Sequence, residues 1–210
     1  MQKVLNLEEF VFHKSENCPA WFCKKYYYGG ANFRYHSFQM VLNILFQDHV
    51  NPLIVETGCQ RHKEDLGAGM STSIFGEYVN HYGGRLITVD IDAHALEVCR
   101  NVTKLFSAQI QYVLSDSVVF LEKMTETPDL LYLDSYDYDL KNVENQRLSQ
   151  EHCLSEFKAI ESRLGVNSIV LLDDSGLPGG GKPKLVKFYM AEHGWICLYD
   201  WQQSVWIRRR

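Results

Sequence analysis

The stretch LIVETG at residues 53–58 constrains the fold of this chain more than any other part of the sequence. Its apolar, partly β-branched start predicts a strand buried on both faces, and the run ends on a carboxylate, Glu56, and a glycine, Gly58. A second set of glycines and hydroxyl residues then opens a segment with helical spacing: Gly67, Gly69, Ser71 and Thr72. This order of strand, glycine-rich turn and helix favours a ligand at the carboxyl end of the strand. A carboxylate there suits a cationic or hydroxyl-bearing ligand better than a pyrophosphate.

The alternation of short apolar runs with helical spacing continues along the chain. Further strands are expected at residues 85–89, 110–114, 129–133 and 168–172, and helices at residues 35–51, 93–106, 118–124, 146–164 and 184–193. Two last strands, at residues 195–200 and 204–208, lie close enough in sequence to form a hairpin. Five strand–helix units followed by a hairpin predict an α/β fold. We expect a doubly wound, mostly parallel seven-stranded sheet with an antiparallel C-terminal hairpin.

Residues 1–33 differ from the rest of the chain. Eight aromatic residues lie between Phe10 and Phe33 without a steady period. Because large apolar side chains are rarely left in water, this segment is expected to pack on the main domain, residues 34–210, or on another subunit. Two interpretations stay open: cover for the core, or a lid over the ligand site, with Trp21 or the tyrosines at 26–28 lining the pocket.

Charge and hydropathy exclude several classes of protein. The formal charge of −5 argues against a general nucleic-acid binder, which normally has a basic face. No apolar run approaches the roughly 20 residues that span a bilayer, and the N-terminus lacks the apolar core of a signal peptide. We therefore expect a cytoplasmic protein without a nucleic-acid or membrane partner, and a homo-oligomer stays possible.

Carboxylates follow the expected parallel strands at or next to their carboxyl ends: Glu56, Asp90, Asp116, Asp134 and Asp173. A single acidic strand end would mean little, since Asp is common in caps and turns. Open α/β sheets bind their ligands at this edge. Five such residues in register therefore predict a ligand site that carries negative charge.

This pattern resembles the class I methyltransferases, which have a Rossmann-like fold and use S-adenosylmethionine, from about residue 35 to residue 208. The resemblance implies that the first strand and the following turn hold the cofactor through Glu56, Gly58, Gly67, Gly69, Ser71 and Thr72. Asp90 stands where that family grips the ribose hydroxyls, with Ile91 beside it, and Asp116 and Ser117 stand where the adenine is usually recognised. Asp134 is expected to reach the cofactor as well. The segment 59–66 is longer than the usual glycine loop of the family. An NAD enzyme would instead need G-x-G-x-x-G directly after the strand, which this chain lacks.

A narrower resemblance lies in three aspartates, Asp134, Asp173 and Asp174. Metal-dependent small-molecule O-methyltransferases, of the catechol and macrolide-sugar kinds, carry a carboxylate after the fourth strand and an acidic pair after the fifth. The resemblance implies that these residues hold Mg²⁺, a cation that prefers oxygen ligands and can acidify a bound hydroxyl. A metal-free enzyme in which one of these carboxylates acts as the base is the alternative.

The candidates for the catalytic base are Asp137 and His36. Asp137 lies near the position where the catechol-type enzymes carry a lysine, so their mechanism cannot simply be copied. Gly179-Gly180-Gly181-Lys182 lacks the spacing of a phosphate loop. It predicts a flexible rim over the acceptor, in which Lys182 or Lys184 is available to an anionic group of the substrate.

The sequence therefore predicts S-adenosylmethionine-dependent methyl transfer to a hydroxyl of a small molecule, of sugar or natural-product type, assisted by a divalent metal. A metal-free N- or protein methyltransferase is one alternative. The other is a non-catalytic module that keeps the fold and binds the cofactor.

Overall fold

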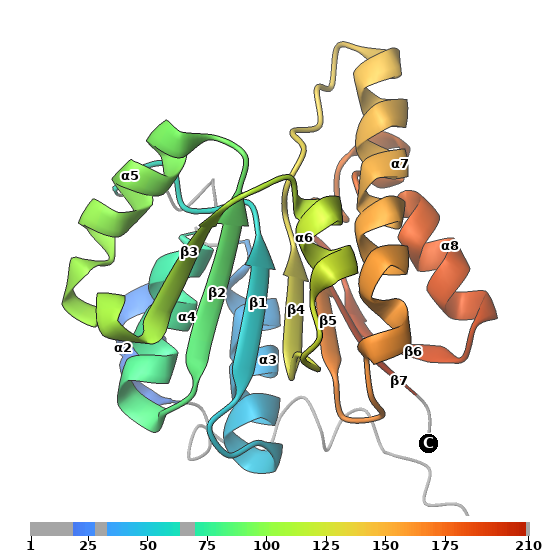
Figure 1. Ribbon diagram of the computed structural model, residues 1–210. Coiled ribbons are helices and arrows are strands. Elements are labelled where there is room, and N and C mark those ends of the chain that lie inside the picture. Colours follow the sequence, from blue (N-terminus) through green and yellow to red (C-terminus); the bar gives the residue numbers. More distant parts are fainter. Residues whose placement is uncertain (1–18, 28–32, 64–69, 209–210) are drawn as a thin grey trace, which may run out of the picture.

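The computed structural model describes residues 19–27, 33–63 and 70–208 (Figure 1). Seven strands form one sheet in the order β3-β2-β1-β4-β5-β7-β6. The strands are β1 (Leu53–Thr57), β2 (Arg85–Asp90), β3 (Ile110–Leu114), β4 (Leu130–Leu133), β5 (Ile169–Leu172), β6 (Trp195–Asp200) and β7 (Ser204–Arg208). The first five pair in parallel, whereas β7 pairs antiparallel with both β5 and β6. The predicted fold class and the C-terminal hairpin are confirmed.

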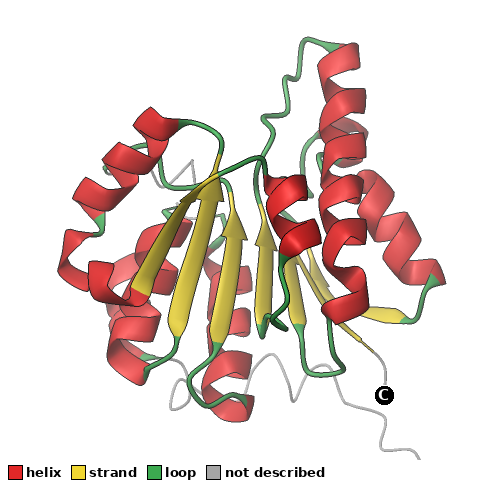
Figure 2. Cartoon of the chain, viewed as in Figure 1, coloured by secondary structure: helices red, strands yellow, loops and turns green. Residues whose placement is uncertain are grey.

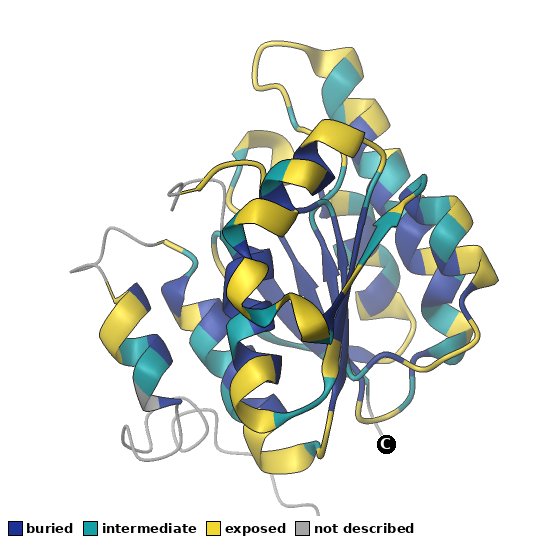
Figure 3. Ribbon diagram, turned by 60° about the vertical axis from the view of Figure 1, so that its left-hand side comes forward, coloured by how far each residue is buried: buried dark blue, intermediate teal, exposed yellow. Residues whose placement is uncertain are grey.

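Alternate residues of the strands enter two separate cores, as the period of two in a strand requires. On β1, Ile54 packs in the core beneath α3 and α4, whereas Leu53 and Val55 pack in the core beneath α6, α7 and α8. All five residues of β1 are buried. Figures 2 and 3 show the resulting three layers, with a buried sheet between two layers of helices.

The helices are α2 (Ala20–Tyr26), α3 (Tyr35–Asp48), α4 (Ser71–Tyr82), α5 (Ala93–Val102), α6 (Ser117–Lys123), α7 (Val143–Ile160) and α8 (Lys184–Glu192). Short 3₁₀ turns occur at η1 (Lys104–Gln109), η2 (Glu161–Arg163) and η3 (Pro178–Gly180). In α6 the carboxylate of Asp116 caps the helix by accepting from the backbone N–H of Val119 at 2.9 Å. The acidic residue after β3 therefore fixes the start of the next helix.

Several helix boundaries differ from the predicted ones, among them the ends of α3 at Asp48 and of α7 at Ile160, and two others show a local cause. The helix expected at 93–106 ends at Val102, and Thr103 Oγ1 donates to the carbonyl oxygen of Cys99 at 2.7 Å as the chain turns into η1. The helix expected from residue 146 begins at Val143, because Asn142 caps it by accepting from the N–H of Asn145 at 3.1 Å. In both cases a local side-chain bond decides the boundary, and apolar spacing does not reveal such a bond.

The described part of the N-terminal segment is helix α2. Phe22 and Tyr26 are 0% and 1% exposed and belong to the core beneath α3 and α4. Tyr26 also donates to Glu77 on α4 at 3.2 Å, and Trp21 stacks on His81. Residues 20–26 thus cover the core, and neither Trp21 nor Tyr26 lines the pocket described below. Tyr27 is exposed and does not line the pocket either, whereas Tyr28 and residues 1–18 lie outside the described ranges.

None of the helices in the described ranges combines the length and the apolar character needed to cross a bilayer.

Candidate active site

A pocket of about 400 Å³ opens at the carboxyl edge of the sheet, over the ends of β1, β2, β3 and β4. Among the described residues, five aspartates line it, together with the cationic Arg61 and with His152. Those aspartates are Asp90, Asp92, Asp116, Asp134 and Asp137. The pocket is therefore strongly acidic, as the row of carboxylates in the sequence predicts.

Glu56 lies beneath the pocket and is fully buried. Its carboxylate accepts from the hydroxyl of Ser71 and, at 2.7 Å, from that of Thr72, the first two residues of α4. Burial raises the pKa of Glu56 to about 7, although the hydroxyl bonds oppose this shift. Glu56, Ser71 and Thr72 thus tie the end of β1 to the start of α4. In the structure these side chains hydrogen-bond to one another. Their predicted contact with a cofactor stays a prediction.

Gly58 lines the pocket and adopts a positive φ of 78°. A Cβ atom there would lie 2.5 Å from the backbone oxygen of Asp134, closer than real Cβ contacts. Glycine is thus required because the chain passes against the end of β4, in addition to any approach of a ligand. Gly67 and Gly69 lie outside the described residues.

Asp90 and Ile91 follow β2 at the pocket wall, and Ile91 is 74% exposed. One carboxylate oxygen of Asp90 accepts from the N–H of Cys59 at 3.1 Å, and the other accepts from the N–H of Asp92 at 2.8 Å. Each oxygen keeps a second lone pair, so the side chain is held in place and can still accept from two hydroxyls. Its predicted contact with the ribose stays a prediction.

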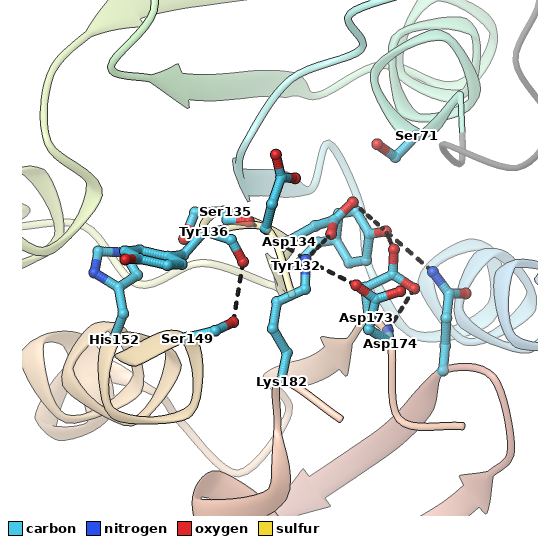
Figure 4. A network of polar contacts seen from close by, with 12 residues as sticks. Ser71, Tyr132, Asp134, Ser135, Tyr136, Ser149, His152, Asp173, Asp174 and Lys182 are labelled. Carbon is cyan, nitrogen blue, oxygen red and sulfur yellow. Dashed lines mark hydrogen bonds and ion pairs between the residues drawn. The ribbon is translucent and has the colours of Figure 1, made fainter. Parts of the chain in front are cut away.

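Asp116 and Ser117 line the pocket where β3 ends. Ser117 Oγ lies 3.1 Å from Nε2 of His152 on α7, and Glu156 lies 3.6 Å from the same nitrogen. Burial lowers the pKa of His152, but Glu156 outweighs it, and the pKa lies above its usual value. His152 also stands 5.4 Å from the ring of Tyr136, which faces it across the pocket wall (Figure 4).

The three predicted metal ligands converge beside this pocket (Figure 4). Asp134 follows β4, and Asp173 and Asp174 follow β5. Lys182 Nζ lies 2.6 Å from Asp134 Oδ1 and 3.1 Å from Asp174 Oδ2. Arg34 Nε lies 2.8 and 3.0 Å from the two oxygens of Asp173, and its Nη2 lies 3.1 Å from Asp174 Oδ1. Two side-chain cations thus bind three carboxylates.

Tyr132 and Gln203 complete this group, which we call the carboxylate cluster: Arg34, Tyr132, Asp134, Asp173, Asp174, Lys182 and Gln203. The hydroxyl of Tyr132 lies 2.9 Å from Asp173 Oδ2 and 3.1 Å from Asp134 Oδ2, and it accepts from Gln203 Nε2 at 3.1 Å. Burial opposes the ionisation of Asp173, but Arg34 outweighs it and lowers the pKa of this carboxyl to about 2. Burial and the charge of Asp173 raise the pKa of Asp134.

The carboxylate cluster does not fit a divalent metal as it stands. Every oxygen of Asp134, Asp173 and Asp174 lies within hydrogen-bond distance of Arg34, Tyr132 or Lys182, and the single O–H of Tyr132 is shared between Asp134 Oδ2 and Asp173 Oδ2. Across the described ranges, no three His, Cys, Asp or Glu side chains are arranged to hold a metal ion. Magnesium needs open oxygen ligands in near-octahedral geometry. The predicted Mg²⁺ site is therefore not supported.

The two candidate bases lie in different surroundings. Asp137 lines the pocket, but its side chain is 71% exposed and forms a two-point ion pair with Arg61 at 2.8 and 3.0 Å. The bond from Arg61 lowers the pKa of Asp137, which makes it a weaker base. His36 is exposed on α3 next to Tyr35 and is not among the pocket-lining residues.

Four residues of the site were not predicted from the sequence, and Lys182 lies elsewhere than predicted. The four are Arg34, Arg61, Tyr132 and His152. The predicted flexible rim would leave Lys182 free for a substrate, but this side chain is 5% exposed and bound to the carboxylates. No local pattern singles these residues out, because each binds a partner that lies far away in the chain. The number of carboxylates was a usable signal. Several carboxylates that meet at one edge of a sheet require counter-charges, which predicts Arg or Lys side chains beside them.

A family model described as a methyltransferase domain matches residues 65–175. The match covers more than half of the 210 residues and includes the pocket residues that follow β2, β3 and β4. The chain belongs to this methyltransferase family. The predicted enzyme class, S-adenosylmethionine-dependent methyl transfer, is thereby confirmed. No curated protein matches the chain.

Solved methyltransferase structures share the fold of this methyltransferase. The SAH-bound Podospora anserina methyltransferase PaMTH1 has a TM-score of 0.57 at 14% identity over 97% of this chain and 92% of that chain. The calicheamicin methyltransferase CalS11 has a TM-score of 0.57 at 13% identity, over 82% and 77%. The Geobacter metallireducens precorrin-6y C5,15-methyltransferase has a TM-score of 0.52 at 14% identity, over 81% and 85%. At such low identity the likeness concerns the fold alone.

Proposed function

We propose that this methyltransferase transfers the methyl group of S-adenosylmethionine to a hydroxyl of a small molecule, with Asp134 as the base and without a divalent metal. In this reaction the methyl group moves from the sulfonium to the acceptor oxygen, the hydroxyl proton moves to Asp134, and S-adenosylhomocysteine leaves. Because the displacement is in line, the alignment of the two molecules supplies much of the acceleration.

The observation that carries this proposal is the position of Asp134. It alone among the three aspartates of the carboxylate cluster lines the pocket, and its side chain is 20% exposed. Lys182 and Tyr132 bind one oxygen each, which fixes the carboxylate while leaving each oxygen a lone pair. A base must be held within reach of the proton that it accepts, and a fixed carboxylate at the pocket wall supports this role for Asp134.

The acidity of the pocket supports the donor and narrows the acceptor. A sulfonium cofactor carries positive charge and is attracted by the five lining aspartates. The same charges repel a phosphate backbone, so a nucleic acid is disfavoured as the acceptor. An amine would keep its proton among these carboxylates, which leaves its lone pair unavailable, and a neutral hydroxyl does not meet this obstacle.

Asp137 is the second candidate for the base, because it also lines the pocket. Its ion pair with Arg61 would have to open before Asp137 could accept a proton. His36 stays a third candidate, but it lies on α3 outside the pocket lining, so the acceptor would have to reach it there.

Formation of S-adenosylhomocysteine over a panel of sugars, phenols, natural-product alcohols and amines tests the proposal. We expect turnover on a hydroxyl acceptor. With that acceptor, Asp134→Asn should lower kcat by about 10²–10⁴-fold, the usual contribution of a general base. Cofactor affinity should fall far less, because four of the five lining aspartates remain. The matched variant Asp137→Asn should keep most of the activity. Turnover on amines alone would contradict the hydroxyl acceptor, and a large loss in Asp137→Asn alone would move the base to Asp137. Cofactor binding without turnover on any acceptor would favour the non-catalytic module.

A further inference from the structure

Lys182 is buried at a place where a lysine is costly. It is 4% exposed, and an ammonium removed from water must be paired and hydrogen-bonded to persist. Three oxygens surround its Nζ: Asp134 Oδ1 at 2.6 Å, Asp174 Oδ2 at 3.1 Å and the carbonyl oxygen of Ser135 at 3.3 Å. An ammonium has three donors, so each N–H has an oxygen before it. Within the described residues, nothing in this arrangement leaves a donor for a substrate.

The loop before α8 is shaped to deliver this side chain. Gly181 has a positive φ of 62°, and a Cβ atom there would overlap the backbone oxygen of Asp174. Only a glycine allows the chain to pass so close to the end of β5. Asp174 itself adopts a positive φ of 56°, an uncommon conformation for a residue with a side chain. Both features bring Lys182 between Asp134 and Asp174.

The ammonium stands where the sequence predicted a metal. Lys182 Nζ bridges one oxygen from the β4 end and one from the β5 end, as a shared divalent cation would. Asp134, Asp173 and Asp174 carry three formal negative charges, and Arg34 and Lys182 supply two positive ones. A divalent cation bound by these carboxylates would lie close to the Lys182 ammonium, which already contacts two of them. The two positive charges would repel each other.

We infer that Lys182 is a built-in cation that takes the place of a divalent metal, holds Asp134 for its role and excludes the metal from the carboxylate cluster. Lys182 is thus a positioning residue, because it acts through Asp134. The consequence for catalysis rests on the proposed function, but the exclusion of metal does not, since it concerns binding by the protein alone.

Removal of the ammonium should therefore create a metal site. We would titrate Mn²⁺ into the protein without cofactor or acceptor and follow the free ion by electron paramagnetic resonance. The wild-type protein should show no saturable binding at the cluster. Lys182→Ala should gain one Mn²⁺ site per chain, and a second substitution, Asp134→Asn, should abolish it. Lys184→Ala serves as the matched control, because it removes an exposed lysine two residues further on, at the start of α8. This variant should bind Mn²⁺ as the wild type does.

Circular dichroism and thermal unfolding report whether each variant folds. Lys182→Met, which keeps the apolar stem while removing the charge, is the second variant and should also gain Mn²⁺ binding. Folded Lys182 variants that bind no Mn²⁺ would overturn the inference. If neither variant folds, the wild-type titration decides. Saturable wild-type binding that Asp134→Asn abolishes would overturn the inference, and its absence would support it. The Mn²⁺ titration needs neither cofactor nor acceptor. Metal exclusion by Lys182 can therefore be wrong while methyl transfer to a hydroxyl is right, and the reverse.

Discussion

Arg34 Nε lies 2.8 Å from Oδ1 and 3.0 Å from Oδ2 of Asp173, although 139 residues separate the two in the chain. The contact joins the residue that precedes α3 to the end of β5. Asp173 is 1% exposed, so its charge depends on a protein partner instead of water. The sequence alone assigns these carboxylates to a metal, but in the structure Arg34 and Lys182 supply two positive charges against their three negative ones.

Loss of Arg34 should destabilise the fold. Arg34→Met leaves Asp173 buried beside a weakened set of donors, and removing one partner of a buried ion pair typically costs 3–5 kcal/mol, so we expect a loss of about that size. Urea unfolding measures it. Arg147→Met is the control, because Arg147 pairs with Glu144 and Glu151 on the exposed surface of α7 and should matter little. Equal effects of the two substitutions would show that the buried pair has no special weight.

Asp90 should govern cofactor affinity. Asp90→Ala removes the carboxylate that lines the pocket after β2 and fixes the backbone N–H of Cys59. Hydrogen bonds to a charged group contribute about 1.5–3 kcal/mol, so S-adenosylmethionine binding should weaken by roughly that amount. Titration calorimetry measures the change, with the exposed Asp48→Ala as control. Unchanged affinity in folded Asp90→Ala would remove the ribose assignment.

Glu56 should make stability depend on pH. Its folded-state pKa is raised from 4.5 to about 7, so its favourable contribution is complete below pH 4.5 and is lost as the pH rises through 7. One pKa unit corresponds to about 1.4 kcal/mol, which sets the full effect at roughly 3 kcal/mol. The free energy of unfolding should therefore fall over this range in the ligand-free protein.

Glu56→Gln should flatten that part of the pH profile, because it keeps an acceptor for Ser71 and Thr72 without a titrating group. Glu97→Gln, at an exposed position on α5, should leave the profile as in the wild type. A profile that keeps its slope in Glu56→Gln would assign the pH dependence to another group.

Helix α2 should behave as part of the core. Phe22 is fully buried and stacks on Tyr26 and Tyr35, with ring centroids 5.4 and 5.2 Å apart. Phe22→Ala should cost about 3–5 kcal/mol in urea unfolding, the usual range for a buried aromatic. Phe188→Ala, on a ring that is 63% exposed, should have little effect. A truncation that tests the predicted lid must therefore keep residues 19–27 and remove only residues 1–18. Little loss in Phe22→Ala would return α2 to the candidates for a mobile cover.

The sheet was predictable because each parallel strand is buried on both faces and reads as an apolar run, as in LIVET of β1. The meeting of the acidic residues that end β1, β2, β4 and β5 was predictable as well, because parallel strands bring their carboxyl ends to the same edge of the sheet. Apolar spacing could not identify the partner of each carboxylate. Arg34 and Lys182 lie 139 and 48 residues from Asp173 and Asp134, and only the packed structure brings them together.

Gly58 shows a related limit. Its place after β1 marked it as a ligand contact, but the need for glycine also comes from the backbone of Asp134, a neighbour set by the pairing of β1 with β4. His152 was invisible for a similar reason. It reaches the pocket from the middle of α7, where its spacing resembles that of any polar residue on a half-buried helix.

Turnover in the presence of excess chelator is the most direct test of methyl transfer without a divalent metal. The protein would be freed of metal, its metal content checked by elemental analysis, and S-adenosylhomocysteine formation measured on the best hydroxyl acceptor. Metal-independent transfer predicts an unchanged kcat, because Lys182 and Arg34 already pair with the carboxylates that a metal would need. Loss of turnover in chelator that Mg²⁺ restores, with cofactor affinity unaltered, would contradict it.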